Sequence, residues 1–230
     1  AREPLQPRRP RLQRSARWRS KLVEATVARA GVVVAGGPPF SEALLVRMLI
    51  AIESAGIGVA LIVNKSDLAE ATRAIAARLD VYRALGYPVF GLTARARPAE
   101  ARAQLRDWLS GRTTLLVGQS GMGKSTLVNA LVPDAAQRTR AISTALSSGR
   151  HTTTFSRMFE LPAEIAPDAH IIDTPGFQSF GLAHLSPWQR AHAMREFVPL
   201  LGRCRFNNCR HRDEPGGAIR EAAERGEIDP

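Results

Sequence analysis

The stretch GQSGMGKS at residues 118–125 constrains this chain more than any other feature. It has the spacing G-x-x-x-x-G-K-[ST], follows the apolar run Thr113–Val117, and leads into the apolar-periodic stretch Thr126–Leu131. Glycines let consecutive backbone N–H groups turn around an anionic phosphate, and the start of the following helix adds its positive dipole end. The pattern predicts a phosphate-binding P-loop, and therefore a bound nucleoside triphosphate. A glycine-rich turn without a ligand is the alternative.

Two side chains of this loop have specific expected roles. Lys124 can reach the β- and γ-phosphates and is a candidate catalytic residue, while the Ser125 hydroxyl can ligate Mg²⁺. The residues expected to bind the nucleotide in this part of the chain are Gly118, Gln119, Ser120, Gly121, Met122, Gly123, Lys124, Ser125 and Thr126.

Length and composition are those of a soluble globular protein. At 230 residues, with 44% hydrophobic and 23% charged residues, the chain can carry one α/β domain and a smaller appendage. No apolar run approaches the ~18–20 residues of a membrane span. The arginine- and proline-rich start has no apolar core like that of a secretory signal. We therefore expect a cytoplasmic protein that does not contact a membrane.

The formal net charge of +11 favours a polyanionic partner such as nucleic acid, and a basic surface without such a partner is the alternative. Of 32 Lys and Arg residues, only Lys21, Lys65 and Lys124 are lysines. Two of these lie in nucleotide motifs, where a slim ammonium stem is needed and a broad guanidinium fork is not. This choice of residue supports both motifs.

Alternating apolar runs and amphipathic stretches predict a parallel sheet with helices on both faces, an α/β fold. The expected strands are Gly31–Ala35, Val59–Val63, Tyr87–Leu92, Thr113–Val117, an edge strand at Phe155–Leu161, and His170–Ile172. The expected helices run from the N-cap Ser41 to Glu53, from Leu68 to about Leu85, and from Pro98 to Leu109, besides the helix after the P-loop.

Both ends of the chain differ from this central part in composition and residue pattern. Residues 1–24 are basic and proline-spaced and are expected to be extended. They are interpreted as a disordered tail or linker, or as the last piece of another domain, and Trp18 suits RNA stacking or a packing anchor equally. From the N-cap Ser186, a helix is expected to about Phe197, followed by an arginine-rich Cys/His loop and an amphipathic stretch at Ala218–Arg225. The expected domains are 1–24, 25–185 and 186–230.

A second nucleotide motif, Asn64-Lys65-Ser66-Asp67, follows the second expected strand. The Asp67 carboxylate can accept two hydrogen bonds from guanine, a donor pair that adenine lacks, so GTP is the expected nucleotide. Asn64 would link this loop to neighbouring loops, and the Lys65 stem would cover the base. Thr93-Ala94, at the end of the third strand, fits a base-contacting loop. All six residues are candidate nucleotide contacts.

The γ-phosphate side of the expected site comes later in the chain. In Asp173-Thr174-Pro175-Gly176, Asp173 is expected to help hold Mg²⁺ and the Gly176 N–H to contact the γ-phosphate. Between the P-loop and Asp173 lies Gly149–Thr154; we favour Thr153 or Thr154 as the Mg²⁺-binding switch threonine, with Thr153 as the candidate. His151 is a candidate for positioning the attacking water, or a solvated loop histidine.

The residue after Gly176 is Phe177, where many GTPases keep a water-orienting glutamine, and Gln178 is one residue late. An apolar side chain there predicts slow intrinsic hydrolysis that depends on a partner to order the switch loops.

The order of the motifs is permuted. A standard GTPase runs from P-loop to switch threonine, D-x-x-G, N-K-x-D and base loop, whereas here Asn64–Asp67 and Thr93-Ala94 come first. The same sheet can form, because chain ends can move when the old termini lie close together. The segment after Asp173 then leads directly into the C-terminal part of the chain.

With this order, the chain resembles the circularly permuted ribosome-biogenesis GTPases of the RsgA (YjeQ) family from about Pro7 to its end. The resemblance rests on four nucleotide motifs and on the cluster at residues 204–211, CRFNNCRH. The four motifs are Asn64–Asp67, Gly118–Thr126, Gly149–Thr154 and Asp173–Gly176. It implies an N-terminal OB-fold, a permuted GTPase and a C-terminal zinc domain. It also implies GTP and Mg²⁺ as ligands, and a GTPase stimulated by the small ribosomal subunit that acts late in its maturation and contacts its rRNA. We expect a monomer.

Two departures from the family pattern stand out. Only the final stretch of the OB-fold matches, at residues 7–24. This partial match is what we expect if the sequence is a fragment of a longer chain. Cys204, Cys209 and His211 match three zinc ligands of the family, but the fourth position, a cysteine, is Gly217 here. Asp213 and Glu214 are possible substitutes, and a metal-free loop is the alternative. The arginines around the cluster suit rRNA phosphates with or without zinc.

Three functions therefore stay open at this stage. The first is a GTP hydrolase acting as a ribosome-assembly switch, of this family or another permuted one. The second is a guanine-nucleotide-controlled rRNA-binding module that hydrolyses GTP weakly. The third is a P-loop kinase that uses ATP, which would not need Asp67 for its nucleotide preference.

Overall fold

A computed structural model of the chain describes residues 12–16, 19–23, 27–36, 40–133, 135, 156–176, 180–207, 209–211 and 214–228. The strands are β1 (Leu12–Ala16), β2 (Arg19–Val23), β3 (Arg29–Val34), β4 (Gly58–Val63), β5 (Val89–Gly91), β6 (Thr113–Val117), β7 (Arg157–Glu160) and β8 (His170–Asp173). The helices are α1 (Glu42–Ser54), α2 (Ala69–Ala84), α3 (Pro98–Leu109), α4 (Lys124–Leu131), α6 (Pro187–His192) and α7 (Ala218–Glu224), with a 3-10 turn at Val198–Leu200.

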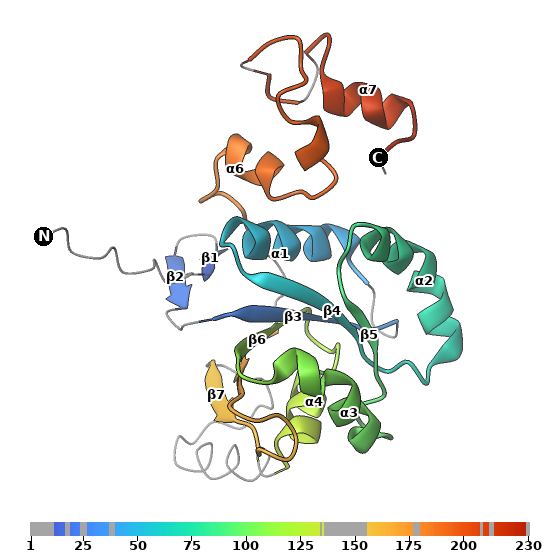
Figure 1. The fold of residues 1–230 in the computed structure, drawn as a ribbon, viewed down its shortest axis with the longest axis vertical. Helices are drawn as coiled ribbons and strands as arrows, with labels where there is room; N and C mark the ends of the chain where they lie inside the picture. Colours follow the sequence, from blue (N-terminus) through green and yellow to red (C-terminus); the bar gives the residue numbers. More distant parts are fainter. Residues whose placement is uncertain are drawn as a thin grey trace, which may run out of the picture.

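A six-stranded sheet in the order β5-β4-β3-β6-β8-β7 forms the centre of the molecule (Figure 1). Five strands are parallel, and only the edge strand β7 runs antiparallel, against β8. The parallel sheet expected from the alternating pattern is confirmed. Parallel neighbours need crossover connections, which the intervening helices supply.

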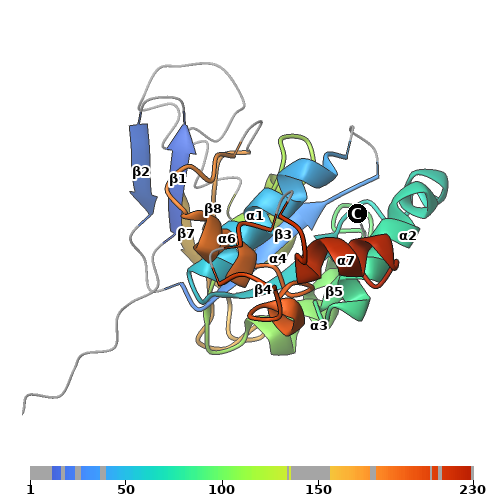
Figure 2. The same ribbon diagram turned by 90° about the horizontal axis from the view of Figure 1, so that it is seen from above.

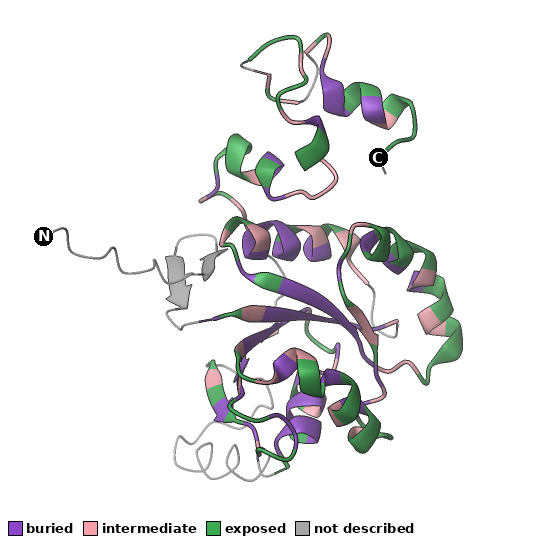
Figure 3. Ribbon diagram, in the orientation of Figure 1, coloured by how far each residue is buried: buried purple, intermediate pink, exposed green. Residues whose placement is uncertain are grey.

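Helices cover both faces of this sheet, α1 and α2 on one and α3 and α4 on the other (Figure 1). Each face has its own apolar core. On one side Val32, Val34 and Leu61 pack with α1 and α2, and on the other Val33, Ile62 and Leu116 pack with α3 and α4. Successive strand residues alternate between faces, so a strand buried on both sides must be apolar throughout. The purple strands of Figure 3 show this burial.

The register of the strands brings several carboxyl ends together. Val34 of β3 is paired with Val63 of β4, Val32 of β3 with Val117 of β6, and Leu116 of β6 with Asp173 of β8. The loops after β4, β6 and β8 therefore leave the sheet at the same edge. In open sheets of this kind, ligands bind at that edge.

The N-terminal residues expected to be extended form an antiparallel hairpin of β1 and β2, in which Leu12 is paired with Val23 and Ala16 with Arg19. The hairpin forms a two-stranded sheet of its own, which lies to one side of the main sheet (Figure 2).

The helix expected from Ser186 to about Phe197 is shorter than predicted. Its start is as expected, because Ser186 and Gln189 form a capping box, but α6 ends at His192. The chain instead turns so that the Arg195 side chain reaches the α1 and α2 side of the sheet. There it contacts the Glu53 carboxylate at 2.8 Å and the Leu85 carbonyl at 3.2 Å.

Among the residues after Leu185, α6 lies next to α1, and α7 lies farther from the sheet (Figure 1). Ala193 and Met194 contact Ile50 of α1 in a small apolar cluster. A separate cluster joins Leu200 to α7 through Ala218, Ile219 and Ala222. The expected amphipathic stretch at Ala218–Arg225 thus forms α7 and buries its apolar side. Among the described residues, no helix has the length and apolarity required to cross a bilayer.

Candidate functional site

A pocket of about 520 Å³ opens at the edge of the sheet where β4, β6 and β8 end. It is lined by residues from four loops that are distant in sequence: Asn64, Lys65, Asp67, Leu68, Thr93, Ala94, Arg95, Ser120, Gly121, Gly123, Lys124, Ser125, Thr126, Thr174 and Gly176. Its size is that of a small-molecule site. The loops that sequence analysis assigned to base and phosphates share this one pocket.

Asn64 links three of these loops. It is buried at 2% exposure, and its side-chain nitrogen donates to the carbonyls of Met122 and Gly123, both at 3.3 Å. Its side-chain oxygen accepts from the Ala94 N–H at 3.2 Å. A buried amide that lost these partners would cost about 1–3 kcal/mol. Asn64 therefore fixes the positions of the loops after β5 and β6 relative to its own loop.

The next three residues divide their roles. Lys65 adopts a left-handed backbone (φ 60°), and its Nζ donates to the Gly121 carbonyl at 2.9 Å, so its stem spans from one loop to the other. The Ser66 hydroxyl donates to the Val63 carbonyl at 3.0 Å, which places it as a turn residue behind the pocket wall. Asp67 is exposed and lines the pocket, with its carboxylate available for a ligand.

The P-loop lysine is held by carbonyls of its own loop. Lys124 is buried at 6% exposure, and its Nζ donates to the carbonyls of Gly118 at 2.9 Å and Gln119 at 3.3 Å. Burial lowers the pKa of Lys124, and the nearby Asp173 carboxylate opposes this shift. The ammonium thus occupies the phosphate side of the pocket at the start of α4, where the helix dipole also favours an anion.

Asp173 ends β8 with 6% exposure, and its Oδ1 has no hydrogen-bond partner among the described residues. Burial raises the pKa of Asp173, while Lys124, the Thr174 backbone and Arg157 lower it. An unpartnered buried carboxylate oxygen is costly in a protein that binds nothing there. A carboxylate oxygen near Lys124 of the P-loop is the donor chemistry that Mg²⁺ prefers.

Two glycines allow the loops to approach this closely. Gly123 has φ +90°, and a Cβ there would overlap the side-chain nitrogen of Asn64. At Gly176 a Cβ would lie 2.8 Å from the Cα and 3.0 Å from the backbone nitrogen of Ser120. The segment after β8 therefore rests directly on the P-loop, which only glycine permits.

Comparison with known proteins agrees with this geometry. A family model described as RsgA GTPase matches residues 5–183. The chain belongs to the RsgA GTPase family. It is 50% identical, over 222 residues, to the small ribosomal subunit biogenesis GTPase RsgA of Paraburkholderia xenovorans, covering 96% of this chain and 70% of that protein. The resemblance noted from the motifs is confirmed.

Solved structures give the same answer for the fold. YloQ, described as a circularly permuted GTPase, matches with a TM-score of 0.66 and 28% identity, covering 88% of this chain and 63% of that one. YjeQ from Thermotoga maritima matches with a TM-score of 0.67 and 26% identity, covering 88% of this chain and 66% of that one. The chain therefore has the permuted GTPase fold and spans slightly less than two thirds of each solved relative.

Not every residue expected to contact the nucleotide lines the pocket of this RsgA-family chain. The Met122 side chain is buried in the core under α4, and only its carbonyl faces Asn64. Gly118 and Gln119 contribute the carbonyls that hold Lys124. His151, Thr153 and the rest of Gly149–Thr154, together with Phe177 and Gln178, lie outside the described residues.

Three lining residues were missed by sequence reasoning: Leu68, Arg95 and Thr174. The Thr174 hydroxyl donates to the Leu116 carbonyl at 2.7 Å and ties β8 to β6 beside the P-loop. Leu68 and Arg95 directly follow the assigned motifs Asn64–Asp67 and Thr93-Ala94. Only their position next to an assigned loop could have indicated that Leu68 and Arg95 line the pocket.

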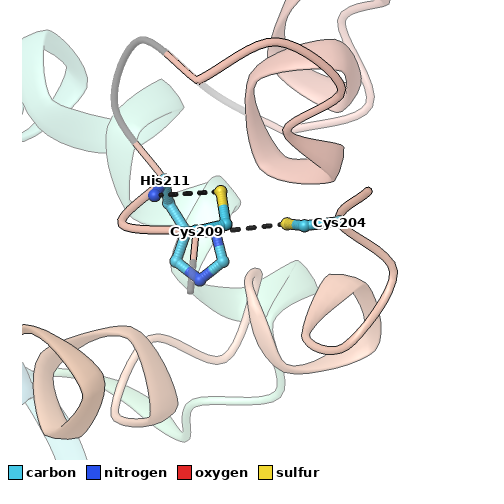
Figure 4. Close-up of side chains that lie close together, drawn as sticks. All are labelled: Cys204, Cys209 and His211. Atoms are coloured by element: carbon cyan, nitrogen blue, oxygen red, sulfur yellow. Dashed lines mark hydrogen bonds between the residues drawn. The ribbon is translucent and has the colours of Figure 1, made fainter. Parts of the chain in front are cut away.

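The second group of candidate ligands lies between α6 and α7 (Figure 4). The donor atoms of Cys204, Cys209 and His211 all lie within 4.8 Å of one another. Cys204 Sγ is 3.4 Å from His211 Nδ1, and the His211 N–H donates to Cys209 Sγ at 3.4 Å. The three residues matched from sequence are thus brought together, while Asp213 lies outside the described residues.

Proposed function

We propose that this chain is a Mg²⁺-dependent GTP hydrolase that acts on the small ribosomal subunit late in its maturation. One observation carries the proposal: a single pocket is lined by the N-K-x-D loop, the P-loop and the D-x-x-G segment. No one of these motifs specifies the activity alone, but together they supply base, phosphate and metal contacts. Membership of the RsgA GTPase family supports the same conclusion.

Guanine would be selected by Asp67. Its exposed carboxylate lines the pocket and can accept hydrogen bonds from the ring N–H and the exocyclic amine of guanine. Adenine would leave that carboxylate facing an acceptor. The Lys65 stem, fixed by its bond to the Gly121 carbonyl, would cover one face of the base. Thr93 and Ala94 would form the opposite loop of the base site.

The phosphates would be held by the P-loop. Lys124 would exchange its two loop carbonyls for phosphate oxygens, which is favourable because a buried ammonium gains more from an anion than from a neutral carbonyl. Mg²⁺, bound through Ser125 and supported by Asp173, would neutralise charge that develops on the phosphates. The Gly176 N–H would donate to the γ-phosphate from its position against Ser120. Thr153 and His151 keep their proposed roles as switch threonine and water-positioning residue.

The partner is proposed from the relatives. The protein of Paraburkholderia xenovorans carries small ribosomal subunit biogenesis in its name. A net charge of +11 suits a surface that contacts rRNA phosphates. We propose that the chain binds the subunit as a monomer and that the subunit stimulates its hydrolysis.

The parts of the chain have proposed roles as well. Residues 25–185 would form the GTPase domain, residues 1–24 a remnant of an N-terminal OB-fold, and residues 186–230 an RNA-contacting zinc domain. Two thiols and an imidazole within 4.8 Å are a donor set that fits Zn²⁺. Of the two candidates for a fourth ligand, Glu214 is the one that the structure describes, and its Oε2 lies 3.9 Å from Cys209 Sγ. Bound zinc would fix the loop between the two cysteines.

The decisive experiment measures GTP turnover by the full chain with and without purified small ribosomal subunits. We expect slow intrinsic hydrolysis and stimulation of at least about a hundredfold; a group supplied by a partner can raise GTPase turnover roughly 10³- to 10⁵-fold. Lys124→Ala should abolish turnover in both conditions, while Arg83→Ala on the surface of α2 should behave as wild type. Tight GTP binding without stimulated turnover would contradict the proposal and support a weakly hydrolysing RNA-binding module.

A further inference from the structure

A second pocket, of about 430 Å³, lies in the C-terminal segment beside the Cys/His cluster. All three residues of the cluster form part of its wall, and the remainder includes Trp188 and His192 of α6 and Phe206 and Asn207 of the following loop. It is far larger than a metal ion requires and is separate from the nucleotide pocket. Nothing in the proposed nucleotide chemistry uses it.

The pocket gathers exposed aromatic rings. Trp188 is 67% exposed and Phe206 is 45% exposed. They are the only aromatic side chains among the large hydrophobic residues found exposed in the described part of the chain, and both line this pocket. The exposed surface of α6 is visible in green in Figure 3. Exposed rings gathered at one hollow indicate a binding site, whereas scattered single ones do not.

Both rings are held in place. The Trp188 indole packs against His192 with ring centroids 3.8 Å apart, and His192 Nδ1 is 2.9 Å from the Trp188 carbonyl. The guanidinium of Arg205 lies 5.4 Å from the centroid of the Phe206 ring. The capping box at Ser186 and Gln189 fixes the first turn of α6, which carries Trp188. Rings ordered before binding lose little conformational entropy when they stack on a ligand.

Many ligands have a flat apolar face that could stack on these rings, and the positive charge around the pocket favours the anionic ones. None of the described residues that line it carries a carboxylate, and its polar lining groups include the Asn207 amide and the His192 and His211 imidazoles. Exposed Arg203, Arg205 and Arg210 belong to the same loop. An amide can pair with the edge of a base, aromatic rings stack on its face, and arginines contact the flanking phosphates.

We propose that this pocket binds an unpaired base of single-stranded RNA, stacked on Trp188 and Phe206. The proposal rests on the proposed function in one respect: rRNA of the small subunit is the natural source of such a base. Zinc at the neighbouring cluster would hold both ends of the loop that presents Phe206. An apolar side chain of a ribosomal protein is the competing occupant, and the test separates the two.

The test is the affinity of the full chain for a fluorescein-labelled single-stranded RNA ten nucleotides long, compared with the duplex of the same sequence, at fixed salt. Trp188→Ala and Phe206→Ala should each weaken single-strand binding about 5- to 150-fold, the range for removing one stacked base. Trp188→Phe should retain most of the affinity. Val198→Ala is the matched control, since Val198 is 53% exposed in the same segment but outside the pocket lining.

The salt dependence distinguishes stacking from charge. Trp188→Ala should leave the slope of log affinity against log salt unchanged, because no phosphate contact is removed, whereas Arg205→Gln should reduce that slope by about one. Equal binding of single strand and duplex, or wild-type RNA affinity in both alanine variants, would overturn the proposal. So would variants that bind RNA normally but lose stimulation by small subunits, since they would indicate a protein partner. If small subunits do not stimulate GTP turnover by the wild type, but the RNA-binding results are as expected, the proposed function is refuted and the RNA-binding pocket is not.

Discussion

The side chain of Asn64 donates a hydrogen bond to the carbonyl of Gly123 at 3.3 Å, across 59 residues of sequence. Gly123 has the left-handed backbone that precedes α4, and it has no room for a Cβ beside the Asn64 amide. The loop after β4 and the P-loop are therefore coupled directly, because Asn64 also donates to the Met122 carbonyl and Lys65 donates to the Gly121 carbonyl.

Gly123→Ala should lower GTP affinity by at least about tenfold while the chain stays folded. Left-handed backbone costs a residue with a Cβ roughly 1–2 kcal/mol, and here the methyl also displaces the Asn64 amide. Gly111→Ala is the control, because Gly111 also has positive φ but no described atom lies within 4 Å of where its methyl would be. The Gly111→Ala variant should lower the stability of the fold without changing the affinity for GTP. Titration with fluorescent GTP and thermal unfolding measure the two effects, and equal GTP affinities in both variants would refute the coupling.

Asp67→Ala should remove the preference for GTP over ATP. Losing the acceptor for two guanine donors should weaken GTP binding about a hundredfold or more, with little change for ATP. Competition binding with GDP and ADP gives the ratio directly. Glu70→Ala, which removes a carboxylate from the first turn of α2, is the matched control and should keep the wild-type ratio. An unchanged ratio in Asp67→Ala would place base recognition elsewhere.

Asp173 should make the nucleotide-free protein less stable as pH rises. Burial raises its pKa above the ordinary value of 3.8, so the folded chain keeps this proton at pH values where the unfolded chain has lost it. Stability therefore falls as pH rises from 3.8 through the raised folded-state pKa. Asp173→Asn cannot titrate, so its melting temperature minus that of wild type should grow as pH rises above 3.8 and level off above the raised folded-state pKa.

The same substitution should have the reverse effect with ligand present. Wild type should gain extra thermal stability from GTP when Mg²⁺ is added, and Asp173→Asn should lose most of that gain. A melting-temperature difference that stays flat with pH would contradict the role of burial. An Mg²⁺ effect that survives in the variant would contradict the role of Asp173 in metal binding.

Arg195→Ala should loosen the C-terminal segment from the GTPase fold. The Arg195 guanidinium contacts the Glu53 carboxylate at 2.8 Å, the Leu85 carbonyl and the face of Tyr87, with its centre 3.8 Å from the ring centroid. Loss of these contacts should cost roughly 1–3 kcal/mol of local stability. Hydrogen exchange should accelerate at residues 186–200.

Arg83→Ala provides the comparison for Arg195. Arg83 pairs with Asp80 on an exposed face of α2, where such pairs contribute about 0–1 kcal/mol. It should leave exchange at residues 186–200 unchanged. Equal protection in the two variants would show that the apolar cluster around Ile50 alone holds the segment.

Glu214→Gln should weaken zinc binding about tenfold or more if its carboxylate completes the site. Gly217→Cys should strengthen binding and should rescue Glu214→Gln. The reason is that a Cβ at Gly217 would lie 3.8 Å from Cys209 Sγ, within reach of the cluster. Zinc affinity is measured by competition with a chromophoric chelator. Glu221→Gln on α7 is the control, and wild-type affinity in Glu214→Gln would exclude that ligand.

The local chemistry of the nucleotide motifs could be predicted from sequence, because it depends on a few adjacent residues. The spacing around Lys124 is set by the size of a phosphate chain, and the N-cap at Ser41 and the capping box at Ser186 are short-range devices. Long apolar runs likewise predicted the buried strands. The helix end near Phe197 was wrong because it depends on where Arg195 finds its partners, which lie far away in sequence.

The sequence by itself therefore determined the P-loop, the guanine motif, their permuted order and the class of the sheet. Only the tertiary structure decided that Asn64 bridges three loops, that the Met122 side chain faces the core, and that one oxygen of Asp173 is buried without a partner among the described residues. It alone brought Trp188 and Phe206 to one pocket. The physical reason is that strand order and register set contacts between residues tens of positions apart, and no local spacing encodes those distances.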